Sequence, residues 1–226
     1  MADEALFDAA DQKTFLTGRP WREFAQPVEL EKHGPATVIS MVNQKGGVGK
    51  TTSTINLGAC LAEQGRKVLL VDLDPQGALS AGLGVSYEDD QVTVYDLLFD
   101  NTASIHAAIH TTNVSGLDVV PANIDLSAAE IQLVNEVGRE HTLARALRPV
   151  RNEYDFIFLD CGPSLGLLTV NALACSQGVI IPMECEYFSL RGLALLTDTV
   201  EKVRDRINFD LDIVGILVTM FDRRTT

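Results

Sequence analysis

A glycine-rich segment between two patterned segments constrains the fold of this 226-residue chain more than any other feature. Residues 43–52 read NQKGGVGKTT; they follow an apolar run at 37–42 that predicts a buried strand, and they lead into a helical pattern at 50–64. Glycines let backbone N–H groups turn toward an anion without Cβ clashes, and the positive end of the next helix points at the same anion. The sequence therefore predicts a phosphate-binding loop that joins a strand to a helix.

The loop departs from the usual G-x-x-x-x-G-K-[ST] pattern at two positions. Gln44 stands where the first glycine is expected, and an extra lysine stands at Lys45. We expect Lys50 to reach the β- and γ-phosphates of a nucleotide and the Thr51 hydroxyl to ligate Mg²⁺. The residues expected to surround the phosphates are Gly46, Gly47, Val48, Gly49, Lys50, Thr51 and Thr52.

Three carboxylates come at the ends of predicted strands. Asp72 and Asp74 follow the apolar run that begins at Lys67, and Asp160 ends the run at 155–160. Ligands of an open α/β sheet bind outside the carboxyl ends of its strands. We therefore expect Asp160 to hold Mg²⁺ directly or through water, and Asp74 to orient an attacking water. The alternative for Asp72 or Asp74 is a helix cap or a turn.

The rest of the chain alternates strands with helices. Such alternation predicts a doubly wound α/β fold, with a mostly parallel sheet and helices on both faces. We assign residues 1–35 to a flexible extension and residues 36–226 to one nucleotide-binding domain that continues past residue 226, because no helix follows the last strand. Strands are expected at 37–42, 67–72, 117–121, 155–160, 178–182 and 213–219, and helices at 50–64, 94–99, 104–109, 126–137, 139–147, 165–175 and 190–206, with 73–90 as loop.

The composition is that of an acidic globular protein. Hydrophobic residues make up 46% of the chain, and no apolar run approaches the roughly 18 residues of a membrane span. The formal net charge is −13. Because nucleic-acid affinity comes mostly from Lys and Arg that neutralise phosphates, this charge alone argues against nucleic-acid binding. The four cysteines form no C-x-x-C pair, so we expect reduced thiols in a cytosolic protein rather than a zinc site.

Taken together, these segments resemble the ParA family of P-loop ATPases, whose phosphate loop carries an extra lysine. The family includes chromosome- and plasmid-partitioning proteins and is related to MinD. The resemblance covers residues 36–226. It is carried by NQKGGVGKTTSTINLGACLAEQG, VLLVDLDPQG, FIFLDCGPSLGLLTVNAL and TMFDRRT.

The resemblance implies an ATPase that uses ATP and Mg²⁺ and forms a homodimer when ATP is bound. Lys45 matches the family's signature lysine, which reaches the partner's bound phosphates. Lys50 and Thr51 match the lysine and the Mg²⁺ ligand of the phosphate loop. Asp74 matches the acid that supports hydrolysis, and Asp160 matches the second carboxylate motif.

The family also implies what the dimer does. The ATP-bound dimer binds DNA without sequence preference and positions chromosomal DNA or other cargo, and hydrolysis, stimulated by a ParB-like partner, releases it. Arg224 matches an arginine of the family's DNA surface, and Arg223 lies beside it. The resemblance thus implies a cytoplasmic, nucleoid-associated protein. Gly162 departs from the family, which usually has proline or a larger residue there.

Three other functions stay open. One is a MinD-like or paralogous ATPase that acts in division-site placement at the membrane or nucleoid; the membrane form needs an amphipathic helix that would follow Thr226. An iron–sulfur protein resembling the nitrogenase reductase needs cluster ligands, for which Cys161 is the candidate. A small-molecule synthetase of the amidotransferase type has no specific motif here.

Overall fold

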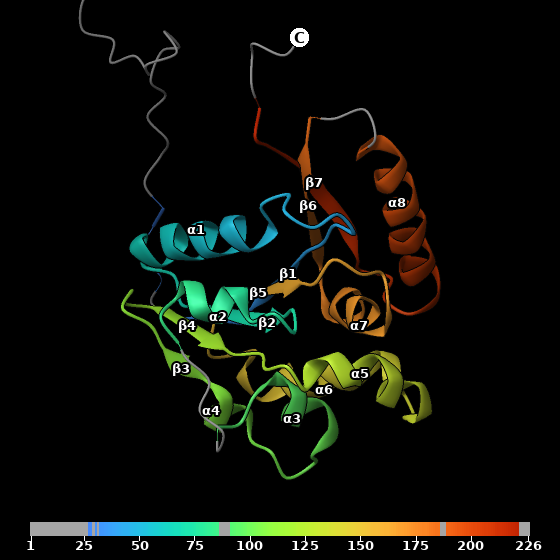
Figure 1. The fold of residues 1–226 in the computed structure, drawn as a ribbon. Helices are drawn as coiled ribbons and strands as arrows, with labels where there is room; N and C mark the ends of the chain where they lie inside the picture. The colour runs from blue at the N-terminus through green and yellow to red at the C-terminus, as the bar shows by residue number, and fades with distance from the viewer. Residues whose placement is uncertain (1–26, 29, 31, 86–90, 186–188, 222–226) are drawn as a thin grey trace, which may run out of the picture.

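The computed structural model describes residues 27–28, 30, 32–85, 91–185 and 189–221 (Figure 1). Most of the 1–35 extension, together with Arg223 and Arg224, lies outside these residues. The strands are β1 (Thr37–Met41), β2 (Val68–Leu73), β3 (His110–Thr111), β4 (Leu117–Val120), β5 (Phe156–Cys161), β6 (Gly178–Glu184) and β7 (Asp212–Thr219). The α-helices are α1 (Lys50–Glu63), α2 (Ala78–Gly82), α3 (Val94–Phe99), α4 (Ile105–Ala108), α5 (Leu126–Gln132), α6 (Thr142–Leu147), α7 (Leu167–Cys175) and α8 (Ser189–Arg206).

The strands form one seven-stranded sheet in the order β3-β4-β2-β5-β1-β6-β7. Every neighbouring pair is parallel except β3 with β4, which is antiparallel. Strands β1, β2 and β5 therefore present their carboxyl ends at the same edge. The prediction of a doubly wound, mostly parallel sheet is confirmed.

Two hydrophobic clusters cover the two faces of the sheet. Helices α1 and α2 lie on one face, and α3, α5, α6 and α7 lie on the other (Figure 1). The α1 face buries Leu70, Leu79 and Phe158, whereas the larger opposite cluster includes Leu126 of α5 and Leu173 of α7. Helix α8 joins this larger cluster. Both faces of the central strands are thus buried, which explains why their sequences are apolar throughout.

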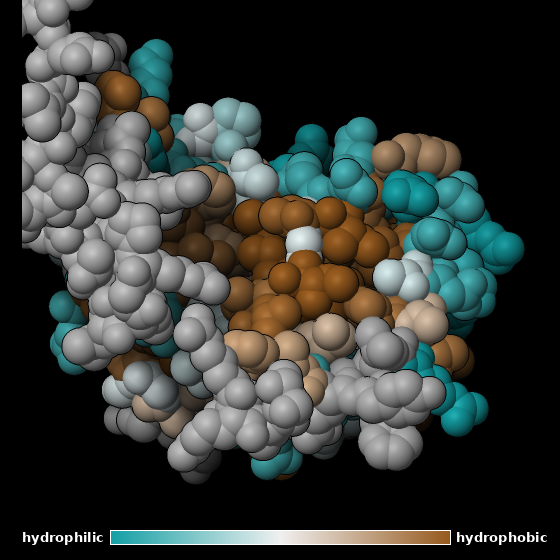
Figure 2. Space-filling view, turned by 90° about the horizontal axis from the view of Figure 1, so that it is seen from above, coloured by the Kyte–Doolittle hydropathy of each residue, from teal (hydrophilic) through white to brown (hydrophobic). Residues whose placement is uncertain are grey.

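Strand β7 is the exception to this coverage. Its side chains Val214, Ile216 and Val218 are 64%, 46% and 50% exposed, although they are apolar. Figure 2, seen from above the view of Figure 1, shows an apolar surface on this side of the molecule. Within the described residues, this edge of the sheet is covered on one face only.

Three local predictions were wrong in detail. Residues 73–90 contain the short helix α2, because Leu79 is buried and Ser80 hydrogen-bonds the buried Asp72. Helix α5 ends at Gln132 and passes into a 3₁₀ turn, where a helix was expected to continue to residue 137. The edge strand β3 was not expected; it has two residues, and only its pairing with β4 defines it.

Candidate nucleotide-binding site

The phosphate-loop segment connects the carboxyl end of β1 to the first residue of α1. Gly47 and Gly49 have φ angles of 76° and 85°, in the left-handed region that side chains disfavour. Helix α1 begins at Lys50 with no side-chain cap and no acid in its first turn. The first backbone N–H groups of α1 are therefore left for an external acceptor, and the helix dipole favours an anion there.

A cavity of about 300 Å³ lies at this loop. It brings together the loop, the N-terminus of α1, Asp74 from the segment after β2, and Pro163 from the segment after β5. Its lining residues are Gly46, Gly47, Gly49, Lys50, Thr51, Thr52, Asp74, Ala78, Pro163 and Met220. Six of the seven predicted phosphate-surrounding residues and Asp74 thus meet at one cavity, which lies at the carboxyl edge of the sheet.

Val48 is the predicted loop residue that does not line the cavity. Its side chain is 1% exposed, and its backbone oxygen accepts a hydrogen bond from the Thr219 hydroxyl at 2.8 Å. Asn43 fixes the start of the loop, because its side-chain amide donates to the Pro182 carbonyl at 2.7 Å and its oxygen accepts from Lys45 N–H at 2.9 Å. The loop is therefore attached to β6 and β7, a role for Asn43 and Thr219 that the sequence did not indicate.

Lys50 lies in the wall of the cavity and is only 7% exposed. Its ammonium donates to the Lys45 carbonyl oxygen at 3.0 Å. Burial lowers the pKa of Lys50, while the negative charges of Asp160 and Asp74 oppose that shift. Lys50 is therefore a cation in the cavity wall that is held at a carbonyl of the loop.

Asp160 is buried and is in contact with Thr51, which lines the cavity. Its carboxylate accepts hydrogen bonds from the Thr51 hydroxyl at 2.6 Å and from the Thr54 hydroxyl at 3.3 Å. Burial raises the pKa of Asp160 to about 7, with a further contribution from the charge of Asp72, which is its register partner in β2. A divalent cation beside this carboxylate would favour its ionised form.

The oxygen donors around Thr51 fit Mg²⁺. The Thr51 hydroxyl and the Asp160 carboxylate are hard ligands in contact with each other, next to a cavity that opens on a helix N-terminus. Among the described residues, no group of three or more His, Cys, Asp or Glu side chains is placed to hold a metal ion alone. That pattern matches Mg²⁺, which is usually held by one or two carboxylates together with water and substrate phosphates.

The two carboxylates after β2 have different surroundings. Asp72 is fully buried and accepts hydrogen bonds from the backbone N–H and the hydroxyl of Ser80, at 3.1 and 2.8 Å, and from Asp74 N–H. Burial raises its pKa to about 6. Asp74 is half-buried, lines the cavity, and accepts a bond from Gln76 N–H at 3.0 Å. Asp72 therefore holds α2 in place, whereas Asp74 is open to a ligand.

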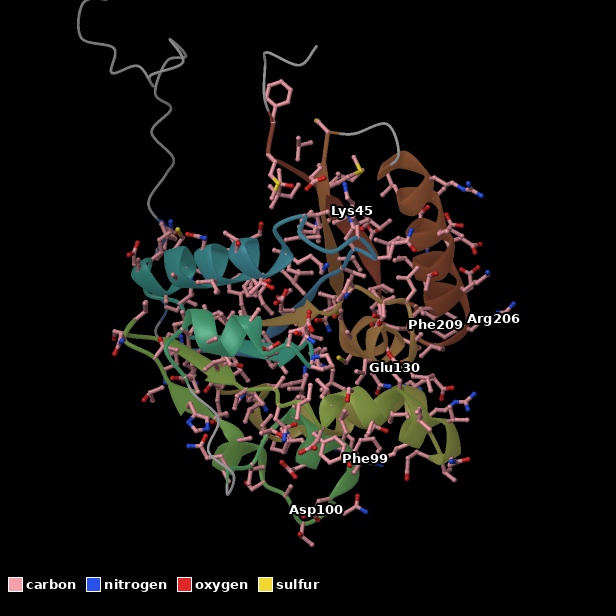
Figure 3. The ribbon with its side chains drawn as sticks, in the orientation of Figure 1. Lys45, Phe99, Asp100, Glu130, Arg206 and Phe209 are labelled. Atoms are coloured by element: carbon pink, nitrogen blue, oxygen red, sulfur yellow. The ribbon has the colours of Figure 1, made fainter. Side chains whose placement is uncertain are left out.

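Lys45 lies near the upper end of β6 (Figure 3) and does not line the cavity of its own chain. Its ammonium forms an ion pair with the Glu184 carboxylate at the end of β6, at 2.5 Å. The Lys45 side chain is 43% exposed, whereas that of Glu184 is 17% exposed. No sequence pattern indicated Glu184, which lies 139 residues from Lys45 along the chain.

Cys161 is buried beside Asp160 and is 2% exposed. Burial, reinforced by the charge of Asp160, raises the pKa of this thiol well above its ordinary value. A cluster ligand must be a thiolate that can reach its metal, so these surroundings argue against the iron–sulfur alternative. No helix in the described part of the chain is long and apolar enough to cross a membrane.

Comparison with known proteins shows the family to which this chain belongs. A family model described as an AAA domain matches residues 36–213. The sporulation initiation inhibitor protein Soj of Bacillus subtilis is 53% identical over 83% of this chain and 74% of that protein. The chromosome partitioning protein ParA of Myxococcus xanthus is 51% identical over 83% of this chain and 66% of its own length. The chain belongs to the ParA family.

An uncharacterised protein of Mycobacterium tuberculosis is 66% identical over 93% of this ParA-family chain. The match covers 66% of that protein, so the chain spans just under two thirds of the length of this relative and of the Myxococcus ParA.

Solved structures agree with the fold of this ParA-family chain. A cobyrinic acid a,c-diamide synthase from Mycobacterium smegmatis, with a bound ATP analogue and magnesium, superposes with a TM-score of 0.80 at 43% identity, covering 84% of this chain and 78% of that one. A plasmid partition protein from Borrelia burgdorferi gives a TM-score of 0.73 at 29% identity, covering 83% and 80%.

Proposed function

We propose that the protein is a Mg²⁺-dependent ATPase of the partition type. ATP binding drives formation of a homodimer that positions chromosomal DNA or other cargo at the nucleoid, and hydrolysis, stimulated by a ParB-like partner, releases the dimer. The observation that carries the proposal is the single cavity that joins the glycine loop, the open N-terminus of α1, Lys50, Thr51 and Asp74.

Within this proposal, each group has a distinct task. ATP phosphates replace the Lys45 carbonyl as the acceptor for Lys50, and they bind the first N–H groups of α1. The Thr51 hydroxyl would hold Mg²⁺, and Asp160 would ligate it directly or through water. When bound, Mg²⁺ neutralises charge on the transferred phosphoryl group. Asp74, in the cavity wall, orients the attacking water.

Lys45 gives a reason for hydrolysis to depend on the dimer. In the single chain its ammonium is paired with Glu184, outside the cavity. A cation supplied by a partner chain can stabilise the charge that builds up on the transferred phosphoryl group, as an arginine finger does. Closure of two chains around ATP would bring each Lys45 to the partner's phosphates.

The test is ATP hydrolysis and ATP-dependent DNA binding by the full-length protein. We expect turnover that requires Mg²⁺, dimers with ATP but not with ADP, and binding to nonspecific DNA that falls steeply as salt is raised. Lys50→Ala is the control that should abolish nucleotide binding. Absence of Mg²⁺-dependent turnover would reject the proposal, and hydrolysis without DNA binding would restrict it to another cargo.

The negative net charge of the chain limits how strongly we expect it to bind DNA. With a net charge of −13, the chain repels phosphates overall, so only a local basic patch can bind them. Arg223 and Arg224 are the candidate DNA-binding residues, and a dimer would carry two copies of each. We therefore propose weak DNA binding by one chain and measurable binding by the ATP dimer, in which two patches act together.

A specific observation also favours a second candidate function, ATP-dependent amidation. The structure of a cobyrinic acid a,c-diamide synthase shares 43% identity with this chain, so ATP-dependent amidation of a carboxylate substrate is the runner-up. ADP formation that requires both cobyrinic acid and an amide donor would favour it. Turnover with ATP and Mg²⁺ alone, stimulated by DNA and a ParB-like protein, would favour partition. Liposome co-sedimentation tests the MinD-like alternative.

A further inference from the structure

The segment after β5 passes the proposed catalytic groups before it enters α7. Pro163 lines the cavity with Asp74, and a Cβ at Gly162 would lie 3.5 Å from the Asp74 carboxyl carbon. Ser164 N–H donates to the Gly162 carbonyl at 2.9 Å, which folds the segment tightly. Residues 162–166, here called the β5–α7 loop, therefore lie beside Asp74 and contribute Pro163 to the cavity wall.

One hydrogen bond joins the first turn of α7 to this loop, and two hydrogen bonds to Glu130 cap the turn itself. The Thr169 hydroxyl donates to the Ser164 carbonyl at 2.8 Å. Glu130, which comes from α5, accepts hydrogen bonds from Leu167 N–H at 2.7 Å and from Leu168 N–H at 3.4 Å. Figure 3 shows Glu130 between α5 and α7. The cap of α7 is thus supplied by a residue 37 positions earlier in the chain.

The absence of a side chain at Gly166 leaves room for the Glu130 carboxylate at the N-terminus of α7. Gly166 is the N-cap residue of α7 and has no side chain that could satisfy the first N–H groups of the helix. A Cβ at this position would clash with both carboxylate oxygens of Glu130. A carboxylate at a helix N-terminus accepts charge-assisted hydrogen bonds and is also favoured by the helix dipole. Gly166 and Glu130 therefore act as one unit.

Helix α5, which carries the Glu130 carboxylate, is anchored in the hydrophobic core. Its Leu126 and Ala129 are fully buried in the larger core cluster. Asn171 of α7 is also buried; its side-chain amide donates to the Arg139 carbonyl and its oxygen accepts from Leu143 N–H. Helix α7 is hydrogen-bonded to the 130–143 segment at two places, of which Glu130 is the one next to the β5–α7 loop.

We propose that Glu130 is a positioning residue for ATP hydrolysis. By capping α7 it holds the β5–α7 loop against Asp74, so that the attacking water is oriented. The inference rests on the proposed ATPase function. The phosphate-binding groups are attached through Asn43 and Thr219 to other strands, so loss of the Glu130 cap affects turnover more than nucleotide binding.

The test compares Glu130→Ala, Glu130→Gln and Gly166→Ala in the full chain. We expect kcat for ATP hydrolysis to fall about 10-fold to 100-fold in Glu130→Ala, with ATP affinity within about twofold of the parent, because small misplacement of reacting groups is costly. Glu130→Gln keeps one acceptor oxygen for Leu167 N–H and should recover part of kcat. Gly166→Ala displaces the carboxylate and should resemble Glu130→Ala.

Two comparisons make the result decisive. Because both substitutions break one contact, the double variant Glu130→Ala with Gly166→Ala should lose no more kcat than either single variant. Glu136→Ala removes an exposed carboxylate from the same segment and should leave kcat unchanged. An unchanged kcat in Glu130→Ala, or equal losses of kcat and ATP affinity, would overturn the inference. If the parent protein itself lacks Mg²⁺-dependent turnover, the proposed function fails instead.

Discussion

At the scale of single residues, Lys45 forms an ion pair with Glu184 of its own chain. The pair holds the signature lysine at the end of β6, 2.5 Å from a carboxylate oxygen. In the proposed dimer, Lys45 would leave this carboxylate to contact phosphates bound by a partner chain. Dimerisation in the proposed mechanism therefore includes an exchange of the Glu184 carboxylate for phosphate oxygens.

Replacement of Lys45 tests this role. Lys45→Ala should retain ATP binding but lose about 10³-fold or more in turnover, the range for cations that act on a transferring phosphoryl group. ADP release under saturating ATP measures the loss. Lys202→Ala is the matched control, because Lys202 is also an exposed lysine paired with a carboxylate, Asp198. Undiminished turnover in Lys45→Ala would reject the assignment.

Replacement of Asp74, also a single residue of the site, tests its role in orienting the attacking water. Asp74→Ala should still bind ATP and dimerise, while turnover falls about 10²-fold to 10⁴-fold because the attacking water is no longer oriented. Nucleotide titration and light scattering measure binding and dimerisation, and a colorimetric phosphate assay measures turnover. Loss of ATP binding in this variant would show instead that Asp74, like its buried neighbour Asp72, has a structural role.

At the scale of elements, the packing of helix α1 against the sheet depends on one glycine. Its buried positions Lys50, Thr54, Gly58 and Ala62 recur every four residues and form one stripe. At Gly58 a Cβ would lie only 2.9 Å from the Leu70 side chain and 3.1 Å from that of Leu117. The glycine permits the approach that places the N-terminus of α1 at the carboxyl edge.

Gly58→Leu should therefore overpack the interface between α1 and β2. We expect the free energy of unfolding to fall by about 1–3 kcal/mol, the usual cost of overpacking a core, and ATP affinity to fall with it. Chemical denaturation measures the change. Cys60→Leu, at an exposed position of the same helix, introduces the same side chain and should alter stability by less than about 0.5 kcal/mol. Equal effects of the two substitutions would contradict the packing argument.

At the scale of the whole molecule, Asp155 joins three segments at the amino ends of the strands, opposite the site. Its carboxylate accepts hydrogen bonds from Lys67 N–H at 2.8 Å, Gly34 N–H at 3.1 Å and the His33 ring at 2.7 Å. Burial tends to raise the pKa of Asp155, but these hydrogen bonds outweigh it and lower the pKa. Folding is therefore linked to ionisation of this carboxyl group.

The linkage predicts a pH dependence of stability. Because the pKa of Asp155 is lower in the folded than in the unfolded chain, its contribution is present above the unfolded value, about 4, and is lost as pH falls through the folded value. Asp155→Asn should reduce the free energy of unfolding by about 1–3 kcal/mol at pH 7. The difference between parent and variant should shrink below about pH 4, and a difference that is constant down to pH 3 would contradict the linkage.

The sequence was most informative where a pattern is local. The glycines of 43–52, the apolar strands and the carboxylates at their ends depend on neighbours within a few residues, and they predicted the parallel sheet and its functional edge. Helix α2 was missed because its five residues are held by Asp72 and a buried Leu79 rather than by their own periodicity. Short elements that depend on tertiary contacts leave weak local patterns.

By itself, then, the sequence determined the family, the fold class and most of the residues that meet at the cavity, although it did not predict Ala78, Pro163 and Met220. Only the tertiary structure showed that Asp72 is a buried support of α2, and it placed Asp74 in the cavity wall. It also paired Lys45 with Glu184 and Glu130 with α7. The reason is physical: glycine conformation and hydrophobic periodicity are local properties, whereas the partner of a charged side chain is set by which distant segments the packed core brings within hydrogen-bonding distance.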